Sequence, residues 1–161
     1  MFRFIGWLMR VLRRERHNIS RKGPPDYLTR WTLWGARFAD RPRHNVYLHC
    51  FHRGDAESYC HDHPWPFWSL ILWGGYWEWT REWDEEAAMY CQVRRWKWPG
   101  MLLRRPADWQ HRVELPPGRR CWTLVWCGPK VRSWGFWCPA GNWIPWRQHQ
   151  ANQDAGGPGC E

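Results

Sequence analysis

The chain has 161 residues, 43% hydrophobic and 18% aromatic, which is enough to bury one sizeable core and too little for two ordinary ones. A chain this apolar is not disordered throughout, because burial can offset the entropy lost on folding. The formal net charge of +9 favours anionic partners, whether small ligands, nucleic acid or lipid. No segment approaches the roughly 20 apolar residues of a membrane-spanning helix.

Residues 1–22 are predicted to form a basic amphipathic helix. Phe4, Ile5 and Leu8 recur at helical spacing, and arginines crowd the end, where cations suit the helix dipole. Arginines also interrupt the apolar run, and no small-residue cleavage site follows, so the segment is not a secretory signal. We expect this helix either to pack on its own domain or to make a peripheral contact with a membrane or a partner.

The main domain is predicted to span residues 27–146 as a succession of short strands. VYLHCFHR alternates two sets of side chains, and the Gly74-Gly75 pair inside FWSLILWGGYWEWT marks a bend or bulge. REWDEEAAMY is predicted to be an acidic surface turn. The remaining predicted strands are QVRRWKW, MLLRRPADWQHRVEL, CWTLVWCG, VRSWGFWC and GNWIPWRQH. Strands about every 8 to 12 residues, without amphipathic helices between them, indicate an antiparallel sandwich or barrel.

The end of the chain, residues 150–161, is polar and glycine-rich and is predicted to be disordered. The seven cysteines form no CxxC pair, which argues against a disulfide framework or a cysteine zinc site. Several fall inside predicted strands, where buried thiols act as small hydrophobic side chains. A reducing, cytoplasmic location is the simplest expectation.

Three histidines make the strongest candidate site. His61 and His63 lie two residues apart, so both face the same side of a strand while Asp62 faces the other. His111, in PADWQH, is the best third ligand. Each histidine alone is more often a hydrogen-bonded core residue than a ligand, but together the three favour a metal site.

This pattern resembles the two-motif signature of the cupin superfamily. His-X-His is followed by Gly-X5-Pro and then His, here with Gly100 and Pro106 before His111. HDHPW and SLILWGGYWE also look like small cupin-like proteins of bacteria and phages. The resemblance implies an all-β fold, the cupin-type double-stranded β-helix or jelly-roll barrel, and a homodimer paired through outer strands.

Two departures from the cupin motifs stand out. The usual glutamate four to six residues after His63 is absent, and Asp108 replaces a glycine of the second motif. A three-histidine set without the glutamate resembles the Fe²⁺ site of cysteine (thiol) dioxygenases. It implies an iron-dependent dioxygenase acting on a small anionic or thiol substrate, although Zn²⁺ or Ni²⁺ would fit the same ligands. Those enzymes place an arginine and a tyrosine near the metal, for which Arg104 and Tyr76 are the candidates.

A non-catalytic role is the alternative. A cupin-like pocket could bind or sequester a nucleotide-like anion, with its base stacked on Trp65, Trp73 or Trp109 and its phosphates on Arg53 and Arg104. Eighteen tryptophans, each with an indole N–H that needs a partner, favour such a lining. Binding of long nucleic acid is not expected, since no recognised motif accompanies the positive charge.

Overall fold

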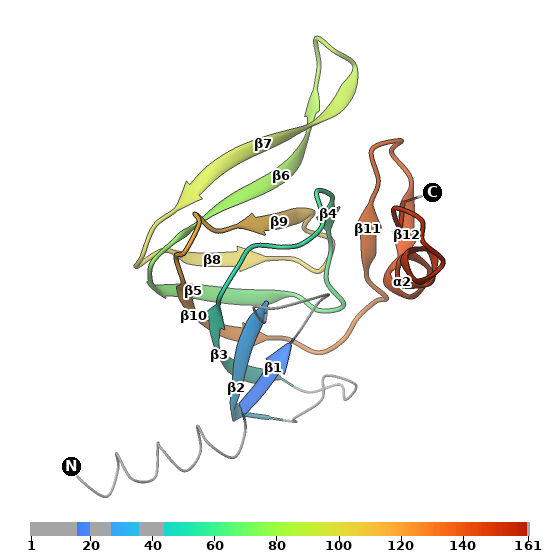
Figure 1. Cartoon of the computed structure of the whole chain (residues 1–161). Helices are drawn as coiled ribbons and strands as arrows, with labels where there is room; N and C mark the ends of the chain where they lie inside the picture. Colours follow the sequence, from blue (N-terminus) through green and yellow to red (C-terminus); the bar gives the residue numbers. More distant parts are fainter. Residues whose placement is uncertain (1–15, 20–26, 36–43, 161) are drawn as a thin grey trace, which may run out of the picture.

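The computed structural model describes residues 16–19, 27–35 and 44–160. Two antiparallel sheets of six strands face each other, and the hairpin of β6 and β7 extends beyond them (Figure 1). The predicted all-β architecture is confirmed. In the first sheet the strands run in the order β1 (Arg16–Ile19), β2 (Leu28–Trp34), β3 (Asn45–Phe51), β10 (Cys121–Cys127), β5 (Phe67–Trp73) and β8 (Leu102–Arg105).

The second sheet carries the histidines. Its order is β12 (Trp143–Pro145), β11 (Gly135–Trp137), β4 (Cys60–His61), β9 (His111–Glu114), β6 (Tyr76–Asp84) and β7 (Met89–Lys97). A single described helix, α2 (Trp146–Asp154), lies beside β11 and β12 (Figure 1). No helix in the described part of the chain is long and apolar enough to cross a membrane.

Alternation along the strands divides the core from the surface. In β10, Thr123 and Val125 are buried, whereas Trp126 is exposed on the opposite face. Cysteines serve as small core side chains, as predicted. Burial raises the pKa of the Cys60 thiol to about 12, so that this thiol stays protonated and unreactive.

The bend predicted at Gly74 and Gly75 is confirmed. It carries the chain from β5 in one sheet to β6 in the other. Both glycines have positive φ, +91° and +94°, and a Cβ on Gly74 would collide with the carbonyl oxygen of Arg120. The chain therefore crosses from one sheet to the other at a position that requires glycine.

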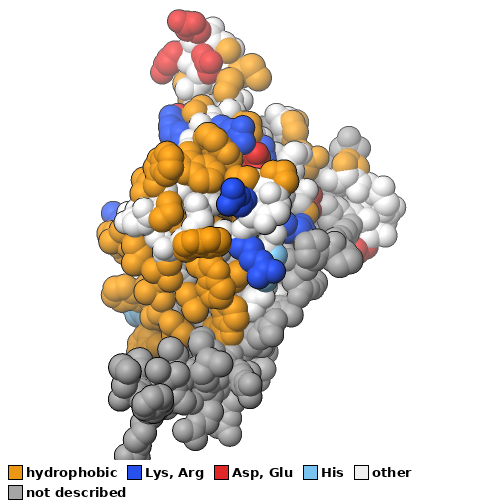
Figure 2. Space-filling model, turned by 60° about the vertical axis from the view of Figure 1, so that its left-hand side comes forward, with side chains coloured by type: hydrophobic (Ala, Val, Ile, Leu, Met, Phe, Trp, Pro, Cys, Tyr) orange, Lys and Arg blue, Asp and Glu red, His pale blue; other side chains and the backbone are white. Residues whose placement is uncertain are grey.

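The middle of the acidic segment is a surface turn, as predicted, but its first four and last two residues belong to β6 and β7. It joins β6 to β7, and the Asp84 side chain accepts hydrogen bonds from the backbone N–H groups of Glu86 and Ala87, both at 3.0 Å. Figure 2 shows the acidic groups gathered at this tip and hydrophobic side chains spread over the body of the molecule below it. The exposed apolar residues of the first sheet include Trp68, Leu72, Trp73, Leu102 and Trp126.

The predicted N-terminal helix is wrong at its end. Arg16–Ile19 forms strand β1, paired antiparallel with β2, because the tertiary partner overrides the helical spacing of apolar residues. Residues 1–15 and 20–22, which carry the rest of that prediction, lie outside the described residues.

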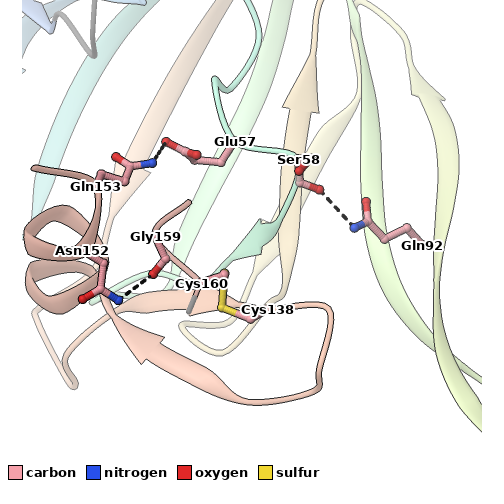
Figure 3. Close-up of a disulfide and its surroundings, with 8 residues drawn as sticks. All are labelled: Glu57, Ser58, Gln92, Cys138, Asn152, Gln153, Gly159 and Cys160. Carbon is pink, nitrogen blue, oxygen red and sulfur yellow. Dashed lines mark hydrogen bonds between the residues drawn. A yellow bond between two sulfur atoms is a disulfide. The ribbon is translucent and has the colours of Figure 1, made fainter. Parts of the chain in front are cut away.

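The prediction of a disordered C-terminal tail is also wrong. Helix α2 occupies residues 146–154. Cys138 forms a disulfide with Cys160, which contradicts the expectation that all cysteines are reduced. The Asn152 side-chain amide donates to the Gly159 carbonyl at 3.0 Å (Figure 3). The imidazole of His149, which is buried, stacks on Phe136 at 4.0 Å. These contacts order a segment whose composition alone would not.

Replacing Cys160 by serine is expected to lower the free energy of unfolding by about 3 kcal/mol, because the disulfide closes a 22-residue separation in the unfolded chain. Urea unfolding with and without reductant measures this. Cys91→Ser, which removes a free and partly exposed thiol, is the control. Equal stability of the Cys160 variant and the wild type, with no response to reductant, would contradict the prediction.

Candidate metal centre

Three histidines come together where β4 meets β9. His61, at the end of β4, pairs directly with His111, the first residue of β9. His63 lies in the loop after β4, and its backbone N–H donates to the Ala107 carbonyl at 2.9 Å. This hydrogen bond holds the loop beside the segment that precedes β9. His63 therefore meets His111, although the two are 48 positions apart in the sequence.

The imidazole rings share one small volume. Their centroids are 5.1 to 5.2 Å apart, and one ring nitrogen of each lies within 4.8 Å of the other two. The Nε2 atoms of His63 and His111 are 2.8 Å apart. Small side-chain rotations would bring all three nitrogens to the 2.0–2.1 Å or so at which imidazole binds a divalent transition metal.

Glu78 orients His111. Its carboxylate is 1% exposed and lies 2.9 Å from Nδ1 of His111. An ionised carboxylate can only accept, so Nδ1 carries the proton and Nε2 presents its lone pair to the other histidines. Metal-bound histidines are typically held this way. The residues therefore fit a divalent metal by both donor set and orientation.

Glu78 is itself held ionised by cations. Arg105 donates to it from Nε at 3.0 Å and Nη2 at 2.6 Å, and Lys97 Nζ lies 3.3 Å away. The Trp109 indole donates at 3.3 Å. Burial alone would raise the pKa of Glu78, but the hydrogen bonds from His111 and Arg105 and the charge of Arg105 lower it well below its ordinary value.

Asp62 faces away from the triad, as strand alternation predicts. It is fully buried and accepts hydrogen bonds from the Gly135 backbone N–H at 2.8 Å and the Trp143 indole at 3.0 Å. Arg132 lies 3.1 Å from the same carboxylate. Asp62 thus ties the histidine loop to β11 and β12 without pointing at the metal position.

A cavity of about 110 Å³ opens beside the triad, between the inner faces of the two sheets. A neighbouring hollow of about 220 Å³ shares much of its wall. The wall is mainly apolar and aromatic, with a few polar groups, which is typical of a small-molecule site. Besides the triad, its residues include Tyr27, Arg30, His49, Phe51, Trp65, Phe67, Tyr76 and Val113.

Comparison with solved structures identifies the architecture. A cupin-2 domain from Rhodospirillum rubrum superposes with a TM-score of 0.53 at 14% identity, over 78% of each chain. The chain has the cupin fold.

Two further matches are weaker. The DMSP lyase DddQ from Ruegeria pomeroyi DSS-3 gives a TM-score of 0.49 at 22% identity, over 76% of this chain and 59% of that one. The hydroxypropylphosphonic acid epoxidase from S. wedmorenis gives 0.47 at 13% identity, over 71% and 56%. The chain thus spans less than two thirds of the length of either enzyme. No protein-family model and no curated protein matches the sequence.

The cupin fold brings two of the other predicted site residues to the cavity. Tyr76 is buried in its wall, where burial raises the pKa of the phenol far above its ordinary value. Trp65 lines the cavity together with Phe67. Phe67 also occupies the region where the absent glutamate was expected, with its ring centroid 4.7 Å from that of His63.

The remaining predicted ligand-binding residues lie elsewhere. Arg104 is exposed on the outer face of β8, and its guanidinium lies 6.0 Å from the Trp68 ring centroid. Adjacent residues of a strand face opposite sides, so its neighbour Arg105 points inward instead. Trp73 is 57% exposed. Trp109 contacts Glu78, and Arg53 lies 5.8 Å from the Tyr27 ring centroid, but neither lines the cavity.

Sequence reasoning missed two functional candidates. Glu78 and Arg30 lie in strands whose alternating pattern looks ordinary. Glu78 could have been found by noting an acidic residue on the buried face of a strand, since such a group needs a buried partner. No local signal shows that Arg30 faces the cavity.

Proposed function

We propose that the protein is a mononuclear metal enzyme of the dioxygenase type, with His61, His63 and His111 as the ligands. The observation that carries this is the convergence of three imidazole nitrogens, one of them oriented by a buried carboxylate, at the wall of a cavity between the two sheets. His61, His63 and His111 would hold Fe²⁺, which would supply positions for a substrate and for dioxygen. Zn²⁺ or Ni²⁺ would use the same ligands.

Residues of the cavity wall surround the substrate with apolar side chains and a hydrogen-bond donor. Phe67, Val113 and Val125 line the cavity beside the triad and make that part of its wall apolar. Tyr76 keeps its phenolic proton because burial raises its pKa, so it can donate a hydrogen bond into the cavity. A small thiol or anionic substrate is the class that such a volume and wall support.

The nucleotide-binding alternative has less support. Of the three indoles proposed to stack a base, the cavity wall contains Trp65. A volume of about 110 Å³ also suits a smaller molecule than a nucleotide.

Protein purified without a metal-chelating tag and reconstituted with Fe²⁺ is expected to hold close to one iron per chain and to consume dioxygen with a small thiol substrate. Because a dioxygenase places both oxygen atoms in its product, ¹⁸O₂ should label that product twice and no external reductant should be needed. Elemental analysis, an oxygen electrode and mass spectrometry measure these outcomes. Full metal loading with no oxygen uptake from any thiol or small anion tested would reject the dioxygenase assignment.

A further inference from the structure

The outward side of the first sheet is unusually apolar. Directly opposed residues of antiparallel strands lie on the same side of a sheet, so the strand register defines two rows of side chains that cross five strands. The first row is Leu102, Leu70, Leu124, Leu48 and Trp31, and the second is Arg104, Trp68, Trp126, Val46 and Trp34. Nine of these ten residues, which we call the outer face, are apolar, whereas the outward side of an antiparallel sheet is commonly polar.

The outer face is open to solvent in both rows. Trp68 and Trp126 are exposed, and the exposed fractions of Leu102 and Trp34 reach 60% and 63%. Helix α2, the one helix in the described part of the chain, contacts β11 and β12 of the second sheet instead. Contiguous apolar patches rimmed by polar groups typically mark contacts with another protein or with a membrane.

Arginines lie at the margins of the outer face. Arg104 is exposed at the end of the second row, on the edge strand β8. Arg119 and Arg120 are also exposed and directly precede β10, at the end of that strand where Trp122 stacks on Trp31. Neither row contains a carboxylate. The acidic groups of the turn between β6 and β7 gather at a separate tip (Figure 2).

This combination of side chains matches an anionic lipid surface better than other partners. Indole rings are favoured at bilayer interfaces, where the ring lies among apolar groups and its N–H stays hydrated. Arginines beside them are attracted to anionic headgroups. A second copy of the chain would bring together two molecules that each carry a net charge of +9. A nucleic acid would require several cations in contact with phosphates, and the two rows contain one.

We propose that the outer face binds the surface of an anionic membrane. Trp68, Trp126 and Leu102 enter the headgroup region, and Arg104 and Arg120 pair with lipid phosphates. Membrane binding of this kind is independent of the proposed function, because strand alternation turns the cavity-lining residues of β5 and β10 to the opposite side of the sheet.

Co-sedimentation of the full chain with lipid vesicles tests the outer face. Wild-type protein should bind phosphatidylcholine vesicles that contain roughly 30% phosphatidylserine and should bind pure phosphatidylcholine vesicles more weakly. Binding should weaken about tenfold or more in the double variant Trp68→Gln/Leu102→Gln, which loses apolar contact with the lipid. The double variant Arg104→Glu/Arg120→Glu should weaken binding to a similar degree, because it reverses the charge at both margins.

Two control variants change exposed residues outside the outer face. Trp83→Gln removes an exposed tryptophan of β6 in the second sheet, and Arg147→Glu reverses a charge on helix α2. Both should bind the anionic vesicles like wild type. Far-UV circular dichroism should be the same for all variants, because each of the changed side chains is exposed.

The proposal would be overturned if wild-type protein did not bind the anionic vesicles, or bound neutral vesicles as tightly. Wild-type-like binding by both double variants would place the lipid contact elsewhere in the chain. Sedimentation equilibrium tests the competing occupant. A wild-type dimer that Trp68→Gln/Leu102→Gln converts to a monomer would assign the outer face to a second copy of the chain, whereas a wild-type monomer agrees with the proposal.

Discussion

Replacing His63 by alanine is expected to abolish metal loading while leaving the fold intact. His63 supplies one of three imidazole nitrogens, and its side chain lies in a loop, so removing it leaves the β4–β9 pairing in place. The loss of affinity should exceed the roughly 10–100-fold that follows removal of a residue hydrogen-bonded to a ligand. Elemental analysis after reconstitution, with circular dichroism for folding, measures both effects.

His61→Ala and His111→Ala should also prevent loading, at a greater cost in stability because both side chains are buried between paired strands. His44→Ala is the matched control, since His44 is exposed and bonds to the Trp126 indole away from the cavity. One metal ion per chain in all three triad variants would show that the ion binds elsewhere. Less than about a tenth of an ion per chain in reconstituted wild type would reject the metal site altogether.

Replacing Glu78 by glutamine is expected to damage both metal binding and stability. Metal affinity should fall about 10–100-fold, because a neutral amide holds the His111 Nδ1–H less strongly than a carboxylate does. The free energy of unfolding should fall by roughly 3–5 kcal/mol, because Arg105 and Lys97 would lose their buried counter-charge. Metal competition and urea unfolding of the metal-free protein separate the two effects.

The same carboxylate gives the protein a defined acid response. The folded-state pKa of Glu78 is lowered from its ordinary value of 4.5, so the unfolded chain binds a proton at a higher pH than the folded chain does. Its stabilising contribution is therefore complete above about pH 4.5 and is lost as the pH falls towards the folded-state pKa. Glu78→Gln should flatten the pH dependence of stability in this acidic window.

Glu82→Gln is the control for Glu78, since Glu82 lies on the same strand and pairs with Arg95 at the surface. Its loss should cost no more than about 1 kcal/mol, because solvent screens an exposed ion pair. Equal effects of the two substitutions on stability, or unchanged metal affinity in Glu78→Gln, would show that Glu78 does not support the triad.

The triad itself was predictable from sequence because two of its histidines are close in the chain and a motif points to the third. His61 and His63 are two residues apart, and the cupin-like spacing of Gly100 and Pro106 points to His111. The bend at Gly74 and Gly75 was predictable for a similar reason, since glycine is the residue that adopts positive φ without strain. Such features depend on a few neighbouring residues.

The surroundings of the triad were decided by the tertiary structure. Arg104 and Arg105 are adjacent and have the same side chain. The register of β8 against β5 determines that Arg105, and not Arg104, faces the core. The partner of His111, Glu78, is 33 residues away, and Arg30 enters the cavity from the opposite sheet.

Sequence by itself determined the strand-rich fold and the three histidines of the candidate site, because period-two alternation and motif spacing are written along the chain. Tertiary structure decided which arginine lies inside, which tryptophan lines the cavity and that Cys138 pairs with Cys160. Each of these depends on which face of a strand meets a partner distant in sequence. A one-residue shift in register exchanges the two faces, and local sequence does not determine that register.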